Sequence, residues 1–173
     1  MSQRRQSFAE RLAAAERWAL HLELRDAYGV ENEADAFAAF RRGEWTEALE
    51  LEDRREWVEL IGAAKARGVA VRRARIVSMP VTEYIRYEHA GTQLNVDAGE
   101  EVRWLERRHA STLQLPGNDF WLFDEALLQF NVFDGPGNWA HTDFTDDPDV
   151  IAFCLTSFEA VWSRAVPHSE FKI

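Results

Sequence analysis

The sequence has one cysteine, two lysines and no long apolar run. Because Cys154 is the only cysteine among the 173 residues, no disulfide can form within the chain, and a reducing compartment is expected. No apolar run approaches the roughly 20 residues needed to span a bilayer. Residues 1–6 are basic but lead into a mixed-charge segment rather than the apolar core of a signal peptide. We therefore expect a cytoplasmic protein that does not bind membranes.

Positive charge is scarce throughout the chain. Twenty Lys and Arg residues face thirty Asp and Glu residues, which gives a formal net charge of −10 and a pI near 5.0. Broad non-specific binding to nucleic acid or to an anionic membrane requires a basic face. The composition therefore argues against direct nucleic-acid binding and favours a partner or surface of opposite charge.

The sequence also lacks a clustered set of metal ligands. Its histidines are His21, His89, His109, His141 and His168. No Cys or His set shows the spacing of a zinc site. The best local pair, His141 and Asp143, lies in an acidic stretch that is typical of a solvated loop. We assign no metal site, no cofactor and no catalytic residue.

Apolar and aromatic residues, in contrast, are plentiful. The chain is 46% hydrophobic and contains seven Trp and eleven Phe residues, most of which should be buried. This is enough for one core, so we expect a single domain over residues 1–173. Within it, a helical N-terminal segment, residues 1–43, should pack on an α/β body formed by residues 53–173.

The N-terminal segment shows a helical period. Phe8, Leu12, Ala15, Ala19 and Leu22 recur at spacings of four and three, which predicts an amphipathic helix of about five turns that ends near residues 28–29. Its apolar stripe would pack on the domain itself or on a partner helix, and packing within the chain is favoured. A second short helix is predicted over residues 33–42.

A helix followed by a strand is predicted over residues 53–77. Asp53 would cap a helix that runs to residue 67, and Gly68 would follow the end of that helix. Residues 69–77 are rich in β-branched types and read as a strand. This order favours an α/β fold in which a mixed sheet is flanked by helices.

The second half of the chain predicts more strands and a long closing helix. Strands are predicted over residues 101–105, 120–123, 127–133 and 139–144, and residues 81–89 fit either a helix or a strand. The strands at 120–123 and 127–133 should pair antiparallel. The final helix should begin at Asp146 or Asp147, with Pro148 in its first turn, and end near residue 165. The tail after this helix should dock on the domain.

Residues 117–124, Gly-Asn-Asp-Phe-Trp-Leu-Phe-Asp, read as a short buried strand that ends in a carboxylate. They resemble the His-x-Lys-x4-Asp motif of the phospholipase D superfamily, with Gly117 and Asp119 in the histidine and lysine positions and only Asp124 retained. The helix-to-strand junction at 63–72 and the Phe-Glu-Ala-Val-Trp segment at 158–162 are also similar to that family. The resemblance implies a phospholipase D-like half without the catalytic motif. Because the nucleophilic histidine is absent, phosphodiester hydrolysis is not expected.

A second resemblance covers nearly the whole chain. Residues 22–28, 96–105, 119–124 and 166–171 resemble an uncharacterised actinobacterial domain family. Members of that family are often encoded beside a helix-turn-helix DNA-binding regulator. The resemblance implies a regulatory setting and such a regulator as the protein partner.

The candidate pocket combines arginines, aromatic residues and carboxylates near the predicted sheet. Its residues are Arg73, Arg75, Tyr84, Arg86, Arg103, Trp104, Asp119, Trp121 and Asp124. Strand alternation places Arg73 and Arg75 on one face. The arginines would bind an anionic small ligand or pair with Glu100, Glu101 and Asp124, and pairing within the chain is favoured. The aromatic residues would line a pocket or belong to the core.

Three functions remain open from the sequence. The first is a non-catalytic regulatory or ligand-sensing protein that acts through a partner, with an acidic surface that docks on a basic DNA-binding domain. The second is an enzyme of unrecognised mechanism that uses Asp119, Asp124, Glu100 and nearby arginines on an anionic small molecule. For Asp124, a structural role in a turn or cap is favoured over catalysis. The third is an inhibitory partner of the toxin–antitoxin type.

Overall fold

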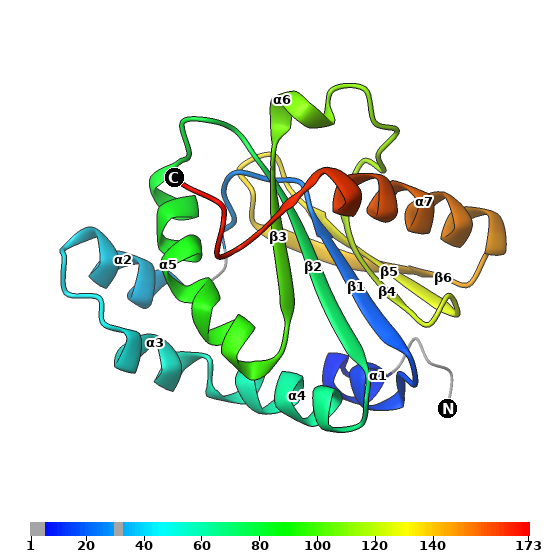
Figure 1. Cartoon of the computed structure of the whole chain (residues 1–173), viewed down its shortest axis with the longest axis horizontal. Coiled ribbons are helices and arrows are strands. Elements are labelled where there is room, and N and C mark those ends of the chain that lie inside the picture. Colours follow the sequence, from blue (N-terminus) through cyan, green and yellow to red (C-terminus); the bar gives the residue numbers. More distant parts are fainter. Residues whose placement is uncertain (1–5, 30–32) are drawn as a thin grey trace.

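A seven-stranded mixed sheet organises the molecule, as the computed structural model shows for residues 6–29 and 33–173 (Figure 1). The strand order is β6-β5-β4-β1-β2-β3-β7. The central strands β1, β2 and β3 are parallel, whereas β4, β5 and β6 form an antiparallel ribbon on one side and β7 pairs antiparallel with β3 on the other. The strands are β1 (Trp18–Glu23), β2 (Ala70–Val77), β3 (Glu101–Glu106), β4 (Asp119–Phe123), β5 (Leu127–Phe133), β6 (Trp139–Thr145) and β7 (Val166–Pro167). The predicted mixed α/β fold is confirmed.

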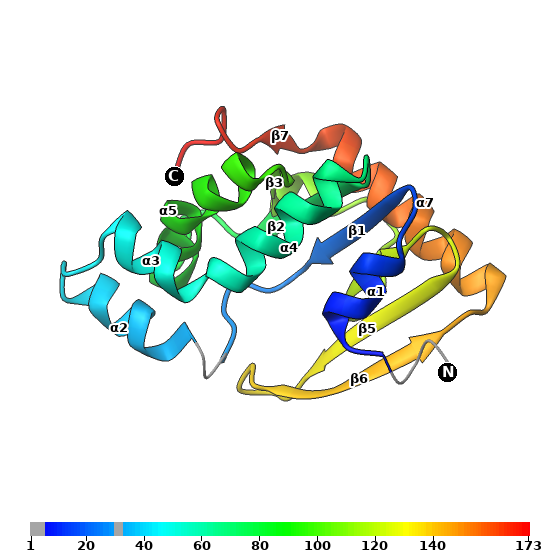
Figure 2. The ribbon, with the colours of Figure 1, turned by 90° about the horizontal axis from the view of Figure 1, so that it is seen from below.

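Helices cover both faces of this sheet (Figure 2). They are α1 (Phe8–Ala14), α2 (Ala34–Arg41), α3 (Glu47–Asp53), α4 (Arg55–Ala66), α5 (Glu83–Ala98), α6 (Arg107–Ala110) and α7 (Pro148–Arg164). One face packs against α7 through a core that includes Leu20, Leu22, Ile76 and Phe158. The other face packs against α1 and α4 in one cluster and against α2 and α5 in a second. Within the described residues, no helix is both long enough and apolar enough to cross a membrane.

The predicted five-turn N-terminal helix is wrong beyond its first two turns. Helix α1 ends at Ala14, and Trp18–Glu23 is instead β1, which lies between β2 and β4 at the centre of the sheet. Because β1 is buried on both faces of the sheet, its apolar residues do not alternate strictly with polar ones. Ala19 and Leu22 therefore also fit the spacing of a helical stripe. The N-terminal 43 residues are therefore not a helical segment packed on a separate body, because they supply a central strand of that body.

One further expectation, about the start of α4, is corrected. Asp53 does not cap the helix that follows it, because it is the last residue of α3. Arg54 is the N-cap residue of α4, and its side chain makes no capping hydrogen bond. The apolar side chain of Phe153 on α7 is 41% exposed. Residues 81–89, which fitted either a helix or a strand, belong largely to α5, where the Thr82 hydroxyl accepts the Ile85 N–H.

Several local predictions are confirmed. The helix–glycine–strand unit is present as α4, Gly68 and β2, and Gly68 adopts a φ of 85°, a conformation that favours glycine. Strands β4 and β5 form the predicted antiparallel hairpin, and β6 is an edge strand. Asp147 caps α7, with Pro148 as its first residue. The C-terminal tail docks on the sheet: β7 pairs with β3, and the Phe171 ring stacks on Trp104 at 5.6 Å between centroids.

Candidate functional site

A cavity of about 310 Å³ lies where β1 and β2 end and β4 begins. Strand alternation sends Leu20 and Leu22 of β1 into the core beneath α7, so His21 and Glu23 face the opposite side of the sheet, where the cavity is. Asp119, the first residue of β4, lies beside the end of β1 and accepts the Leu24 N–H at 2.9 Å. The remaining walls come from α3, α4, α5, β5 and the start of α2.

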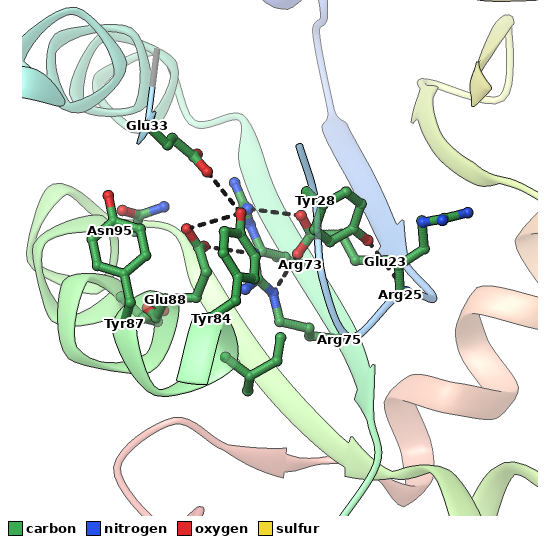
Figure 3. A network of polar contacts seen from close by, with 12 residues as sticks. Glu23, Arg25, Tyr28, Glu33, Arg73, Arg75, Tyr84, Tyr87, Glu88 and Asn95 are labelled. Carbon is green, nitrogen blue, oxygen red and sulfur yellow. Dashed lines mark hydrogen bonds and ion pairs between the residues drawn. The ribbon is translucent and has the colours of Figure 1, made fainter. Parts of the chain in front are cut away.

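Seven buried or half-buried side chains beside this cavity form a continuous series of ion pairs, which we call the charge chain. Figure 3 shows its central members, Glu23, Arg73, Arg75 and Glu88. Arg75 donates to Glu23 at 2.5 Å and to Glu88 at 2.9 Å. Arg73 donates to Glu100 at 2.7 Å and to Glu23 at 3.3 Å. In order of contact, the charge chain is Glu100, Arg73, Glu23, Arg75, Glu88, Arg54 and Glu50.

Arg54 links the far end of the charge chain to the helices. Its guanidinium donates to Glu88 at 3.1 Å and also to Glu50. Glu50 additionally accepts the Trp45 indole N–H at 2.8 Å and the Tyr87 hydroxyl at 3.2 Å. Each of the three arginines thus holds two carboxylates, which satisfies buried charges that would otherwise be costly.

The arginines keep the buried carboxylates of Glu23 and Glu88 ionised. Burial by itself would raise the pKa of Glu23, but Arg75 and Arg73 hold that pKa well below its usual value. Burial likewise acts to raise the pKa of Glu88, and Arg54 and Arg75 outweigh it, so the pKa is lowered. The charge chain is therefore a rigid, charged wall rather than a set of free ligand-binding groups.

Two tyrosine–carboxyl pairs stand beside the charge chain. The Tyr28 hydroxyl donates to Asp119, and the Tyr84 hydroxyl donates to Glu33 at 2.7 Å. Burial raises the pKa of Asp119 to about 7, with the nearby Glu23 charge adding to the effect. Burial and the charge of Glu88 likewise raise the pKa of Glu33 to about 7. Both carboxyl groups therefore change charge near neutral pH.

His21 completes the inner wall. Its Nε2 lies 3.3 Å from the carboxylate of Glu23, and its ring lies 4.2 Å from that of Trp121. Burial lowers the pKa of His21, an effect larger than the opposing influence of Glu23, so the imidazole is neutral at pH 7. Because Nε2–H donates to Glu23, Nδ1 is an acceptor.

The structure brings together five of the nine predicted pocket residues. Arg73, Arg75, Tyr84, Asp119 and Trp121 all line the cavity. The expected pairing of Arg73 with Glu100 is present, and Arg72 of the same strand pairs with Glu101 at 3.1 Å.

Four predicted pocket residues lie elsewhere. Arg86 is exposed on α5, and Arg103 points to the α7 face, where it donates to the Trp162 carbonyl. Trp104 is buried behind the cavity, with the Arg75 guanidinium 5.2 Å from its ring centroid. Asp124 lies at the other end of β4 from Asp119.

Asp124 has a structural role. It occupies the β4–β5 turn with a φ of 49°, and its carboxylate accepts the backbone N–H groups of Glu16, Arg17 and Trp18 at 2.7 to 2.9 Å. Burial tends to raise its pKa, but these hydrogen bonds outweigh burial and lower it. Asp119 and Asp124 therefore do not form the carboxylate pair that the enzyme hypothesis required, and Asp124 does not pair with the arginines.

The sequence analysis missed Glu23, Tyr28, Glu33, Arg54 and Glu88. Glu23 falls within the predicted N-terminal helix, whereas it is the last residue of a central strand. The other four come from a loop and from helices that approach the sheet only in the folded chain. A reading of 18–23 as a strand would have revealed that His21 and Glu23 point to one face, but not which residues oppose them.

Among the described residues, no group of three or more His, Cys, Asp or Glu side chains is arranged to hold a metal ion. His141 and Asp143 lie 3.4 Å apart, and both are exposed on β6. Cys154 is buried in the core beneath α7, and burial raises the pKa of its thiol to about 11, which makes it a poor nucleophile.

Comparisons with known proteins agree with the fold. A solved structure with similar architecture is that of Nuc from Salmonella typhimurium, described as a phospholipase D family member. The two share 11% sequence identity with a TM-score of 0.53, over 92% of this chain and 86% of that one, a likeness that concerns the fold alone. A search of curated proteins gave no significant match. The family profile of a domain of unknown function, DUF6879, matches residues 6–173, and the chain therefore belongs to the DUF6879 family.

Proposed function

We propose that this protein is a non-catalytic, ligand-sensing regulator that acts in the cytoplasm through a protein partner. One observation carries the proposal: a cavity with a preorganised charged wall lies at the sheet edge where Asp119 stands in place of the motif lysine. Ligand sites in open α/β sheets commonly lie beyond the carboxyl ends of the parallel strands. This arrangement supports a site for a small molecule that lacks the nucleophilic histidine of the phospholipase D motif.

The partner is a DNA-binding regulator of the helix-turn-helix class. The gene setting implied by the resemblance, beside such a regulator in actinobacteria, is part of this proposal. The net charge of −10 supports docking on a basic domain. Exposed acidic residues gather on α3 and α4, two helices that also contribute residues to the cavity lining: Glu47, Glu52, Asp53, Glu56 and Glu59. Leu49 and Leu51 of α3 are also exposed, at 51% and 43%, so this surface offers both charge and apolar area.

The enzyme alternative loses its main support. It relied on Asp119 and Asp124 acting together at one strand head, but Asp119 begins β4 and Asp124 follows its last residue, so they lie roughly 16 Å apart at about 3.3 Å per residue. Of the arginines proposed to bind an anionic substrate, Arg73 and Arg75 each hold two carboxylates already, whereas Arg86 and Arg103 lie away from the cavity.

Co-purification from the native cells tests the partner. The tagged protein should retain one DNA-binding regulator at moderate salt and lose it at high salt, because exposed charge pairs are screened. Glu52→Lys combined with Glu56→Lys should abolish this retention. Asp143→Lys combined with Glu159→Lys makes the same charge change on β6 and α7 and should leave it intact. Equal behaviour of the two double variants would contradict docking through α3 and α4.

Native mass spectrometry tests the ligand-sensing part independently. Protein purified from the same cells should carry a small molecule that is lost after Trp121→Ala, which disrupts the cavity wall. A sensing role would be contradicted if the purified protein retained no small molecule and bound its partner equally well before and after dialysis.

A further inference from the structure

Within the described residues, the carboxyl groups of the two tyrosine–carboxyl pairs have no positively charged partner. Asp119 and Glu33 bond to tyrosine hydroxyls, and neither forms an ion pair with any side chain in the described parts of the chain. The arginines of the cavity are each occupied by two carboxylates. Among the described lining residues, six acids, Glu23, Glu33, Glu50, Asp53, Glu88 and Asp119, face only three arginines, Arg54, Arg73 and Arg75. The cavity therefore has an excess of negative charge once Asp119 and Glu33 ionise.

Aromatic rings lie directly beside these two carboxyl groups. The rings of Tyr28 and Tyr84 are 6.0 Å apart, and Phe133 meets Tyr28 edge-on at 5.1 Å. All three residues line the cavity. The face of an aromatic ring attracts a cation, most strongly where water is partly excluded. Carboxylates beside aromatic faces are the combination that recognises organic ammonium groups.

Two buried polar atoms on the cavity wall point to the same chemistry. Asn95 is 3% exposed, and its amide nitrogen donates to Glu100, which leaves Oδ1 without a partner in the described structure. His21 is 6% exposed, and its Nδ1 also has none there. Both atoms are acceptors, and an ammonium or guanidinium group carries only donors. Among the described lining residues, Arg75 Nη1 is the one fully buried donor without a partner, which suits a ligand oxygen such as a hydroxyl.

We propose that the cavity binds a small organic cation, a primary amine or guanidine with an aromatic or apolar part, whose charge lies near Asp119 and Glu33. The inference rests on the proposed ligand-sensing function and specifies its ligand class. An anion would have to displace carboxylates from the arginines while facing six acidic side chains, which is unfavourable in a buried site.

Three matched probes test this ligand class: phenethylamine, 2-phenylethanol and phenylacetate, which share one ring and differ in charge. At pH 8, where groups with a pKa of about 7 are ionised, each probe is titrated into the ¹⁵N-labelled full chain. The indole N–H signals of Trp57 and Trp121, both of which line the cavity, report binding. Phenethylamine should shift these signals with at least tenfold higher affinity than the alcohol or the acid.

Charge-neutral variants localise the site. Asp119→Asn and Glu33→Gln should each weaken phenethylamine binding at least tenfold at pH 8. Glu159→Gln, on the exposed surface of α7 across the sheet from the cavity, should leave it unchanged. If Asp119→Asn fails to fold, Glu33→Gln decides alone, because Glu33 is only partly buried and its side chain makes one hydrogen bond within the described part of the chain.

The outcomes separate this inference from the proposed function. The cationic class would be overturned if phenylacetate bound as tightly as phenethylamine, or if phenethylamine binding survived both substitutions. It would also be overturned if none of the probes shifted the indole signals. The small molecule retained in native mass spectrometry would still support ligand sensing in those cases. A retained molecule that proves to be an amine or guanidine would support both proposals, whereas a retained anion would overturn this one alone.

Discussion

The hydroxyl of Tyr28 donates a hydrogen bond to the buried carboxyl of Asp119, and the backbone N–H of Leu24 donates to the other oxygen. Asp119 is 2% exposed and has no ion-pair partner among the described residues. The protein thus holds a carboxyl group in a position where its charged form is costly. Such a group is typical of a site adapted to a partner outside the chain.

Asp119→Asn is expected to stabilise the protein above pH 7. The folded pKa is about 7 and the ordinary value is 3.8. Between these values the folded state holds a proton that the unfolded state has lost, so wild-type stability falls as the pH rises through this window. Asparagine has no charge to bury, and the gain at pH 8 should be a few kcal/mol, given about 1.4 kcal/mol per pKa unit.

Urea denaturation of both proteins at pH 5 and pH 8 measures this effect. The free energy of unfolding should fall less between pH 5 and pH 8 in the variant than in the wild type. The decline that remains in the variant comes from Glu33, whose pKa is also about 7. Tyr28 and the charges of Glu23 and Arg75 face Asp119 from the neighbouring segments and stay unchanged. Parallel pH profiles for the two proteins would show that Asp119 is already ionised at pH 5.

Arg75→Met should destabilise the fold strongly. The substitution leaves Glu23 and Glu88 without the arginine that bridges them in a buried environment. Breaking a buried pair by removing one partner costs about 3–5 kcal/mol. Arg41→Met is the matched control, since Arg41 and Glu83 form an exposed pair with side chains 61% and 55% accessible. Its effect should stay below about 1 kcal/mol, and a similar loss in the two variants would mean that the charge chain adds nothing beyond a surface pair.

Asp124→Ala should lower stability without affecting the ligand site. The variant leaves the N–H groups of Glu16, Arg17 and Trp18 without their acceptor, at a cost of about 1–3 kcal/mol. Phenethylamine affinity should not change, because Asp124 lies at the opposite end of β4 from the cavity. Thermal unfolding and the probe titration measure the two effects separately. A loss of binding in a folded Asp124→Ala protein would return Asp124 to the candidate site.

Mild acid should loosen the docked C-terminal tail. His168 Nδ1 accepts the Trp104 indole N–H at 3.1 Å, so this bond requires an unprotonated nitrogen. Burial, together with the nearby His89, lowers the pKa of His168 from 6.5 to about 4. Because the unfolded chain takes up this proton first, the stabilising contribution is complete above pH 6.5 and declines as the pH falls towards 4.

Substitution of His168 by asparagine, which keeps an acceptor and does not titrate, should flatten the stability profile between pH 6.5 and 4. The Trp104 indole proton, followed by NMR, reports the hydrogen bond directly. His89, Lys172 and the ring of Phe171 surround this site and remain in place. An unchanged acid profile would assign the pH dependence to other groups.

The sequence by itself determined the elements whose signals are local. The Gly68 junction between α4 and β2, the β4–β5 hairpin, and α7 with its Asp147 cap each depend on residues within a few positions of one another. The resemblance to a phospholipase D-like unit also indicated the fold from short segments. In these places periodicity and turn residues agree with the packing, so the local pattern is sufficient.

Only the tertiary structure decided the position of β1 and the composition of the cavity. Trp18–Glu23 fits a helix or a strand by pattern, and pairing with β2 and β4 on both sides selected the strand. That choice placed Glu23 between Arg73 and Arg75, which the sequence separates from it by about fifty positions. It also set Asp119 beside Tyr28 and left Asp124 at the far turn. Charge pairing and burial depend on which distant segments meet, and no local pattern contains that information.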